Sequence, residues 1–234
     1  LNINDKNTNV AFGEKFTLLH GPAFFEAEEQ GIRYEAGPVT FLQVNSGVRS
    51  KLYEAVLRSV VGTGGEVVVD AYSGGGLLTA MLAKSCKRVY GIELEAEAVR
   101  CADELMRKNG LKNMTNICGP VEEKLEGVLE REKGEEIRLV LDPPRAGIAR
   151  SVLKAILASE IPEIVMVSCN PSTLARDLGI LTGSLTEKDG ELVKNPDFSA
   201  EGLEGYYRIS SVRPFDMFPQ TKNIETLTTL CRVK

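Results

Sequence analysis

The chain has 234 residues, of which 43% are hydrophobic and 26% are charged, and its formal net charge is -5. These values fit a globular protein of one or two domains and exclude a collagen-like, a coiled-coil and a largely disordered chain. No apolar run approaches the roughly 18 residues of a membrane helix. The acidic balance excludes an overall basic nucleic-acid binder, although a local basic patch is compatible with it.

The cysteines are odd in number and widely spaced: Cys86, Cys101, Cys118, Cys169 and Cys231. Because no two of them form a CxxC pair, the sequence predicts neither a zinc nor an iron–sulfur site. Free thiols and the lack of an opening signal peptide favour a reducing, cytoplasmic setting. The first residue is not Met, so we expect a fragment or a processed form of a longer protein.

The first 45 residues contain only short strand-like pieces, at Phe16–Leu19 and Val39–Val44. These pieces are too few to close a domain. We therefore expect residues 1–45 to be a strand-rich remnant of a preceding domain, and residues 46–234 to form the catalytic domain.

Four short apolar runs then recur without polar alternation, as in strands buried on both faces; they are Glu66–Asp70, Arg88–Glu93, Ile137–Asp142 and Ile164–Ser168. Helical patterns lie between them at Glu95–Asn109 and Ser151–Ala158, and Asn170-Pro171 reads as a helix start. This alternation predicts a mostly parallel sheet covered by helices, in a Rossmann-like α/β fold.

The C-terminal part has a different pattern. Tyr207–Arg213 and Thr226–Val233 are rich in β-branched and aromatic residues, with no long helix between them. We expect these segments to form an antiparallel pair at the sheet edge. The stretch Gly183–Gly205 is polar and dotted with glycines, which is typical of an excursion or a mobile loop.

A glycine-rich turn gives the first functional signal. Asp70 ends a strand, and Tyr72, Gly74 and Gly76 follow before a helical pattern. Such a turn lets the backbone approach a ligand closely, and Glu93 ends the next strand, where its carboxylate can bind the ribose hydroxyls of an adenosine cofactor. The alternative is a tight turn with a solvated glutamate.

The spacing of the turn discriminates between cofactors. A dinucleotide site has the pattern GxGxxG, but Gly76 is followed by Leu77, Leu78 and Thr79. An acidic residue four positions before the glycines is typical of S-adenosylmethionine methyltransferases. No phosphate-binding GxxxxGK[ST] loop is present.

Two further strands end in reactive tetrapeptides. Asp142-Pro143-Pro144-Arg145 and Ser168-Cys169-Asn170-Pro171 both follow predicted strands, and ligands bind beyond the carboxyl ends of such strands. We expect Cys169 to be a nucleophile whose thiolate is favoured by the positive end of the helix that follows. The alternatives are a small buried hydrophobe for Cys169 and a turn cap for Asp142.

Arg145, Glu225 and His20 limit the reactions that the chain could catalyse. Arg145 replaces the aromatic residue that follows Pro-Pro in enzymes that methylate exocyclic amines, which argues against that reaction. Glu225 precedes the last apolar strand and is either a general base or only a flanking charge that protects an apolar strand against aggregation. His20 is the only histidine and lies outside these motifs, which argues against a Cys–His hydrolase.

Taken together, the motifs resemble the RNA uracil-C5 methyltransferases, which form 5-methyluridine in tRNA or large-subunit rRNA. The similarity runs in order from about Asn9 to the C-terminus, through Phe41–Asn45, Asp70–Gly76, Asp142–Arg145, Ser168–Pro171 and Phe218–Thr226. The family often has Asn or Thr where Leu77 stands, and a His-rich stretch where residues 220–223 stand. Larger members carry an N-terminal RNA-binding barrel, and some an iron–sulfur cluster, and neither fits before Gln43.

The resemblance implies a role for each matching residue. Cys169 matches the nucleophile and Glu225 the base, while Gln43, Tyr72, Glu93 and Asp142 match positions that contact S-adenosylmethionine. It also implies an RNA substrate, no metal and no membrane. Thiolate addition at carbon 6 of uracil would make carbon 5 nucleophilic, and a base would then remove the carbon 5 proton. Two alternatives stay open, which are methylation of cytosine or protein, and a non-catalytic RNA-binding module of the same fold.

Overall fold

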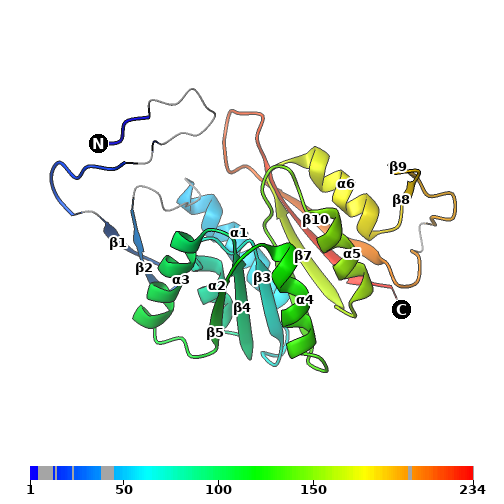
Figure 1. The fold of residues 1–234 in the computed structure, drawn as a ribbon, viewed down its shortest axis with the longest axis horizontal. Coiled ribbons are helices and arrows are strands. Elements are labelled where there is room, and N and C mark those ends of the chain that lie inside the picture. Colours follow the sequence, from blue (N-terminus) through cyan, green and yellow to red (C-terminus); the bar gives the residue numbers. More distant parts are fainter. Residues whose placement is uncertain (5–12, 14, 23, 38–44, 200–201, 234) are drawn as a thin grey trace.

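The computed structural model describes residues 1–4, 13, 15–22, 24–37, 45–199 and 202–233 (Figure 1). The helices among them are α1 (Ser46–Val60), α2 (Leu77–Ala83), α3 (Ala96–Lys108), α4 (Val121–Arg131), α5 (Arg150–Ala158) and α6 (Pro171–Leu181). The strands are β1 (Phe25–Glu29), β2 (Ile32–Ala36), β3 (Val67–Ala71), β4 (Arg88–Glu93), β5 (Met114–Cys118), β6 (Ile137–Leu141), β7 (Glu163–Ser168), β8 (Leu185–Lys188), β9 (Glu191–Lys194), β10 (Tyr207–Phe215) and β11 (Glu225–Arg232).

A seven-stranded sheet in the order β10-β11-β7-β6-β3-β4-β5 forms the centre of the fold (Figure 1). The five strands β7, β6, β3, β4 and β5 run parallel to one another, whereas β11 is antiparallel to both β7 and β10. The predicted fold, a mostly parallel sheet with an antiparallel edge pair from the C-terminus, is therefore confirmed. The chain order changes direction beside β3, which is the place where such sheets bind ligands.

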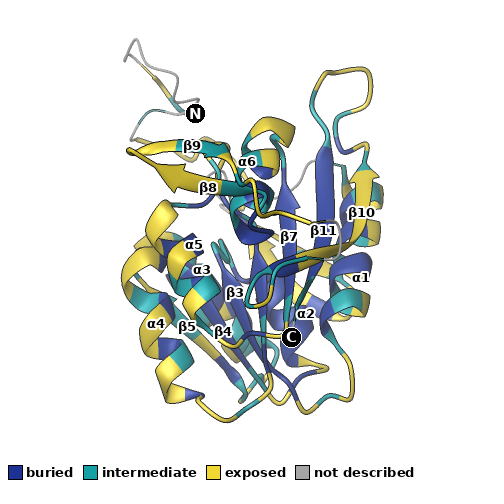
Figure 2. Cartoon of the chain, turned by 90° about the vertical axis from the view of Figure 1, so that its right-hand side faces the viewer, coloured by how far each residue is buried: buried dark blue, intermediate teal, exposed yellow. Residues whose placement is uncertain are grey.

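Both faces of the sheet are covered, and successive side chains of β3 supply both cores. Val68 belongs to the core beneath α1, α2 and α3, whereas Val67 and Val69 belong to the core beneath α4, α5 and α6. Figure 2 shows the central strands buried and most of β10 exposed. Continuous apolar runs are required by this double coverage, which explains why they predicted the strands correctly.

The four apolar runs became β3, β4, β6 and β7, and the two helical patterns between them became α3 and α5. The sequence did not indicate α1, α4 or β5. Strand β5 contains the polar residues Thr115 and Asn116 and lies at the sheet edge, where only one neighbouring strand constrains it. Such an edge strand lacks the apolar signal of a central one.

The segment Gly183–Gly205 differs from the expected excursion or loop, because it contains the antiparallel hairpin β8–β9. Its strands are joined by Asp189 and Gly190, whose φ angles are 52° and 82°. Two positive φ angles are typical of a type I′ turn, for which Asp-Gly is a preferred pair. The dipeptide was therefore the signal for a hairpin, although the polar composition pointed to a loop.

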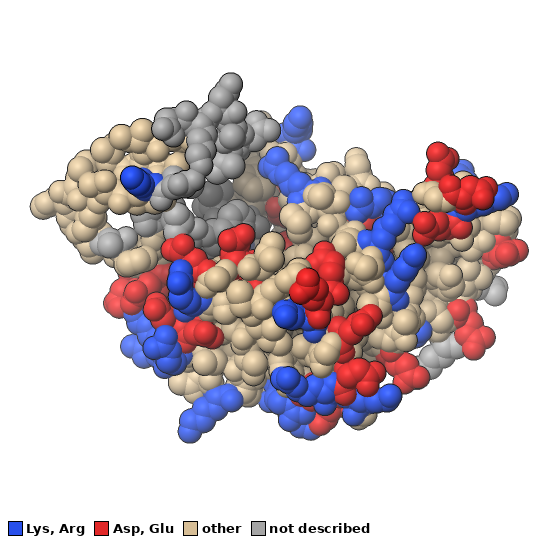
Figure 3. Space-filling model, viewed as in Figure 1, with Lys and Arg blue, Asp and Glu red and all other residues tan. Residues whose placement is uncertain are grey.

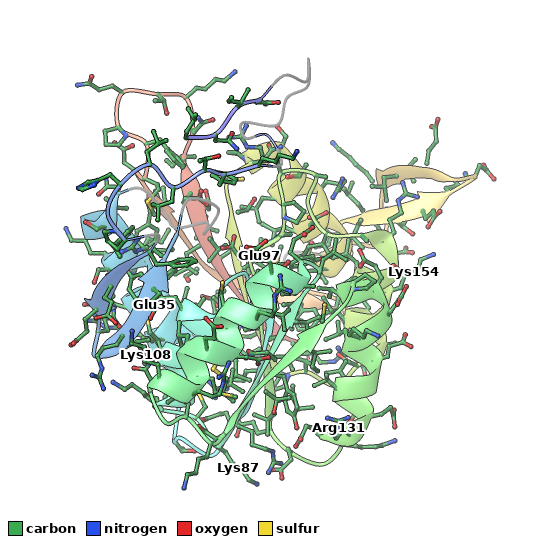
Figure 4. All side chains as sticks on the ribbon, turned by 60° about the vertical axis from the view of Figure 1, so that its left-hand side comes forward. Glu35, Lys87, Glu97, Lys108, Arg131 and Lys154 are labelled. Atoms are coloured by element: carbon green, nitrogen blue, oxygen red, sulfur yellow. The ribbon has the colours of Figure 1, made fainter. Side chains whose placement is uncertain are left out.

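An N-terminal hairpin, β1–β2, packs against the helices on one face of the sheet. Ile32, Tyr34 and Ala36 are buried in the same core as α1, α2 and α3. Lys108 on α3 forms ion pairs with Glu26 and Glu35 of the hairpin, and Figure 4 shows Lys108 and Glu35 at this junction. The domain boundary at residue 45 stays a prediction.

The two strand-like pieces expected near the N-terminus were not found as strands in the described residues. Phe16–Leu19 does not form a strand, although Phe16 lies in an isolated antiparallel bridge with Asn2. Val39–Val44 lies outside the described residues. Within the described ranges, no helix is long and apolar enough to cross a membrane.

Candidate active site

Five acidic or thiol side chains meet at one edge of the sheet. Asp70 lies in β3, Glu93 ends β4, and Asp142 and Cys169 directly follow β6 and β7. These four strands are parallel, so their carboxyl ends share one edge. Glu225 begins the antiparallel strand β11 and therefore lies at the same edge. The structure thus brings together residues that are up to 155 positions apart in the sequence, from Asp70 to Glu225.

The glycine turn after β3 is held in place by Glu93. The backbone N–H of Gly74 donates a hydrogen bond of 2.8 Å to Glu93 Oε2, and the N–H of Glu95 donates one of 2.9 Å to Oε1. A Cβ atom at Gly74 would meet nothing within 4 Å, whereas one at Gly76 would lie 2.6 Å from Ala102 Cβ. Gly74 therefore leaves an open surface, and Gly76 permits close packing against α3.

A cavity of about 630 Å³ opens beside this turn. Asp70, Tyr72, Gly74 and Asp142 line it, together with residues of α3 and of the N-terminal hairpin. Tyr72 has a φ angle of 67°, a left-handed conformation that is uncommon outside glycine and that supports a constrained functional turn. Gln43, the remaining residue expected at the cofactor, lies outside the described residues.

The cavity is strongly acidic at its sheet end. Asp70 is 1% exposed and accepts a hydrogen bond of 2.6 Å from Thr79 Oγ1. Burial raises the pKa of Asp70 to about 7 despite that bond, and the charge of Glu93 adds to the increase. Burial raises the pKa of Asp142 to about 8, with further increases from the charges of Glu225 and Asp70. A ligand with positive charge would relieve this repulsion.

Cys169 and Glu225 are brought together by strand pairing. Thr226 of β11 is the register partner of Ser168 of β7, so the next pair along the two strands is Glu225 and Cys169. Glu225 is 2% exposed, and its Oε2 atom has no hydrogen-bond partner among the described residues. A buried carboxylate oxygen that no protein group satisfies is unusual and is typical of a functional position.

The expected effect of the α6 N-terminus on the Cys169 thiolate stays a prediction. The predicted helix start is correct, because Asn170 caps α6 by accepting a hydrogen bond of 3.1 Å from the Ser172 N–H. However, burial raises the pKa of Cys169, the charges of Glu225 and Asp142 raise it further, and Arg145 only partly opposes them. Burial is the largest cause of this raised pKa.

Arg145 is the cation beside this pair, and α6 fixes the loop that carries it. The backbone carbonyl of Arg145 accepts hydrogen bonds of 3.0 Å from Asn170 Nδ2 and 3.3 Å from Thr173 Oγ1. Farther along the loop, Asp177 accepts a bond of 2.8 Å from the Ile148 N–H. Burial raises the pKa of both Cys169 and Glu225, and the charge of Arg145 partly opposes that increase. From the sequence, Arg145 was interpreted as evidence against exocyclic-amine methylation and as part of the motif Asp142–Arg145, and not as a cation beside the thiol.

Tyr34 and Tyr53 also line the cavity, and the sequence analysis missed both. Tyr53 lies on α1, a helix that was not predicted, so no pattern placed it near the site.

In the described part of the chain, no group of three or more His, Cys, Asp or Glu side chains could hold a metal ion. Figure 3 shows cations and carboxylates interspersed over one face of the molecule.

Comparisons with known proteins identify a matching family and similar sequences. The sequence profile of the family described as tRNA (uracil-5-)-methyltransferase matches residues 23–189. An uncharacterized RNA methyltransferase of Clostridium acetobutylicum is 36% identical over 232 residues, which cover 99% of this chain and 46% of that protein. Another, from Listeria innocua, is 38% identical over 229 residues, with 98% and 46% covered. The chain spans about half the length of these relatives.

A solved structure gives the same fold. The tRNA (uracil-54, C5)-methyltransferase of Pyrococcus abyssi, in complex with S-adenosyl-L-homocysteine, matches with a TM-score of 0.74 and 28% identity. The match covers 98% of this chain and 49% of that one. The expected fold class, the sheet of the S-adenosylmethionine-dependent methyltransferases, is confirmed.

Proposed function

Because the chain belongs to the tRNA (uracil-5-)-methyltransferase family, we propose that it methylates carbon 5 of a uridine in structured RNA with S-adenosylmethionine as the donor. The observation that carries this proposal is that the pairing of Thr226 with Ser168 brings the adjacent residues Glu225 and Cys169 close to each other and to Asp142. A nucleophile and a carboxylate base next to Asp142, which lines the cavity, are the two groups that this reaction needs.

The residues at the sheet edge fit the methyl donor. That cofactor carries a positively charged sulfonium group, which would lower the raised pKa values of Asp70 and Asp142 and favour their ionised forms. Each Glu93 oxygen accepts one backbone N–H and keeps a second acceptor position for a ribose hydroxyl. Gly74 leaves space for close approach, and Tyr72 lines the same cavity. We assign the cofactor to these five residues and, from the resemblance, to Gln43.

Cys169 would start the reaction by forming a bond from its Sγ atom to carbon 6 of uracil. The electron pair of the carbon 5–carbon 6 double bond moves toward the carbonyl oxygen at carbon 4, and carbon 5 becomes nucleophilic. The cofactor supplies an electrophilic methyl group for that carbon. The positive charge of Arg145 beside the thiol opposes the charge of the acids and favours the attacking thiolate.

Glu225 would complete the reaction. Its Oε2 atom has no protein hydrogen-bond partner among the described residues, so it is available to take the proton from carbon 5. The carbon 5–carbon 6 double bond then re-forms and the Cys169 sulfur leaves carbon 6. Because the target base is normally stacked, it would have to be extruded from the RNA before Cys169 could reach it.

Nucleoside mass mapping tests this function. RNA is incubated with the protein and S-adenosylmethionine that carries an isotopically labelled methyl group, then digested to nucleosides. The proposal predicts label in 5-methyluridine and its loss with Cys169→Ser. Label in a cytidine or in protein alone would support the other methyltransferase hypotheses, and RNA binding without any labelled nucleoside would support a non-catalytic module.

A further inference from the structure

Tyr53 occupies a position in the cavity wall that the reaction described above does not use. It lies on α1, lines the cavity together with Asp70 and Asp142, and is partly buried against the core. Among the described residues, no protein group forms a hydrogen bond with its hydroxyl, whereas the neighbouring hydroxyl of Tyr34 accepts one of 3.3 Å from Arg49. A phenol at the edge of a core normally has a partner, so the hydroxyl of Tyr53 is available to a ligand.

The helix that carries Tyr53 is held by a cap at its N-terminus and by an ion pair to the N-terminal hairpin. Asn45 caps its N-terminus by accepting a bond of 3.2 Å from the Val48 N–H. One turn before Tyr53, Arg49 forms an ion pair of 2.5 Å with Glu29 of the N-terminal hairpin. These contacts fix the backbone of α1, so the ring of Tyr53 is presented at a defined place rather than on a loop.

The charges around Tyr53 determine what it can bind. Burial raises the pKa of its phenol, and the charges of Asp142 and Asp70 raise it further, so the hydroxyl stays protonated and acts as a donor. The same two carboxylates attract a cation and repel an anion. The cations that line the cavity, Arg100, Arg107 and Lys108, all belong to α3, and Lys108 is paired with Glu26 and Glu35 of the N-terminal hairpin. The charge of Arg49 on α1 is paired with Glu29. At the end of the cavity lined by Asp70 and Asp142, the protonated hydroxyl of Tyr53 is therefore a neutral donor for the carboxylate of a ligand whose ammonium group lies beside those acids.

We propose that the Tyr53 hydroxyl donates a hydrogen bond to the carboxylate of the amino-acid end of the cofactor, and so selects a ligand with a complete methionine-like portion. This inference rests on the proposed use of S-adenosylmethionine and adds a residue that binds it. The ammonium group would lie toward Asp70 and Asp142, which line the same end of the cavity. Tyr53 is thus a binding residue for the cofactor and not a participant in proton transfer.

Two ligands separate this role from a general effect on the cavity. S-Adenosylhomocysteine has the amino-acid end, and 5′-methylthioadenosine lacks it but keeps the adenosine and the thioether. Tyr53→Phe removes only the hydroxyl. Loss of a hydrogen bond to a charged group should weaken binding of S-adenosylhomocysteine by about tenfold or more, and leave binding of 5′-methylthioadenosine unchanged. The matched control is Tyr206→Phe, a partly buried tyrosine that does not line the cavity.

Titration calorimetry of the three proteins with both ligands gives the result. The inference is supported if only Tyr53→Phe loses affinity, and only for S-adenosylhomocysteine. It is overturned if Tyr53→Phe binds S-adenosylhomocysteine as the unchanged protein does, or if both ligands weaken equally. If the unchanged protein binds neither ligand, the proposed cofactor is wrong and this inference fails with it. Normal affinities with impaired RNA methylation would instead place Tyr53 at the uridine.

Discussion

The side-chain amide of Asn170 spans two parts of the site by donating a hydrogen bond of 3.0 Å to the backbone carbonyl of Arg145 while its Oδ1 atom caps α6. One residue therefore links the loop after β6 to the helix after the nucleophile. The link couples the position of the cation at Arg145 to that of the neighbouring Cys169. It also gives two atoms of one side chain separable roles, in positioning and in stability.

Two substitutions of Asn170 should distinguish those roles. Asn170→Ala removes the cap and should lower the free energy of unfolding by about 0.5–2 kcal/mol. Asn170→Asp keeps an acceptor for the Ser172 N–H but loses the donor to Arg145, so it should unfold nearly as the unchanged protein does and methylate RNA more slowly. Urea unfolding and initial rates check both. Equal rates for Asn170→Asp and the unchanged protein would exclude a positioning role.

The acids around Cys169 should make the pKa of its thiol depend on the charge of the bound cofactor. Burial, Glu225 and Asp142 raise the pKa of Cys169 above its ordinary value. S-Adenosylmethionine, which is cationic at sulfur, should lower the pH at which Cys169 is alkylated by iodoacetamide, and S-adenosylhomocysteine should lower it less. Peptide mass mapping distinguishes Cys169 from the other four cysteines.

A variant provides the control for that measurement. Glu225→Gln removes a carboxylate and should lower the alkylation midpoint of Cys169 in the ligand-free protein, because the charge of Glu225 raises the pKa of the thiol. An unchanged or higher midpoint would mean that the two side chains do not interact. The exposed Cys118 reports any general change in the reagent.

Asp70 and Asp142 should make stability fall as the pH rises. Their pKa values in the folded protein are about 7 and about 8, compared with about 3.9 for an unfolded aspartate. The folded state therefore binds more protons between these values, and the stabilisation present below about pH 4 is lost as the pH rises through about 8. Unfolding by urea between about pH 5 and pH 8 should show this decrease.

Asp70→Asn should flatten that decrease, because the amide does not titrate. The exposed Asp216 gives the matched substitution, Asp216→Asn, which should leave the slope unchanged. An Asp70→Asn variant with the slope of the unchanged protein would show that burial does not perturb this carboxyl in the way described.

Local patterns were sufficient to predict the centre of the fold. The apolar runs at β3, β4, β6 and β7 were identified because burial on both faces leaves a continuous signal. The pair β10–β11 was identified from its β-branched and aromatic residues, although most of β10 is exposed. The polar edge strand β5 and the helices α1 and α4 gave no comparable signal. The Asp189-Gly190 pair is typical of a hairpin turn, but the polar, glycine-rich composition of the surrounding segment obscured the two strands.

The site was predictable only as far as strand ends identify it. Asp142 and Cys169 were expected at one edge because both follow strands, and the structure places them there. The partnership of Cys169 with Glu225 depends on the register of β7 and β11, which spacing along the chain does not encode. The raised pKa of the thiol depends on burial and on the charges of Glu225 and Asp142, which come from separate segments. Tyr53 could not be recognised without the packing of α1.

Covalent trapping on RNA tests the central claim most directly, because Cys169 would act before methyl transfer and Glu225 after it. With S-adenosylmethionine and RNA, Glu225→Gln should accumulate a protein–RNA conjugate that survives a denaturing gel. The lost base contributes about 10²–10⁴-fold to proton removal, so release should be slow rather than absent. Cys169→Ser should form neither conjugate nor 5-methyluridine. Full turnover by Cys169→Ser, or a Glu225→Gln variant with no conjugate and an unchanged rate, would contradict the mechanism.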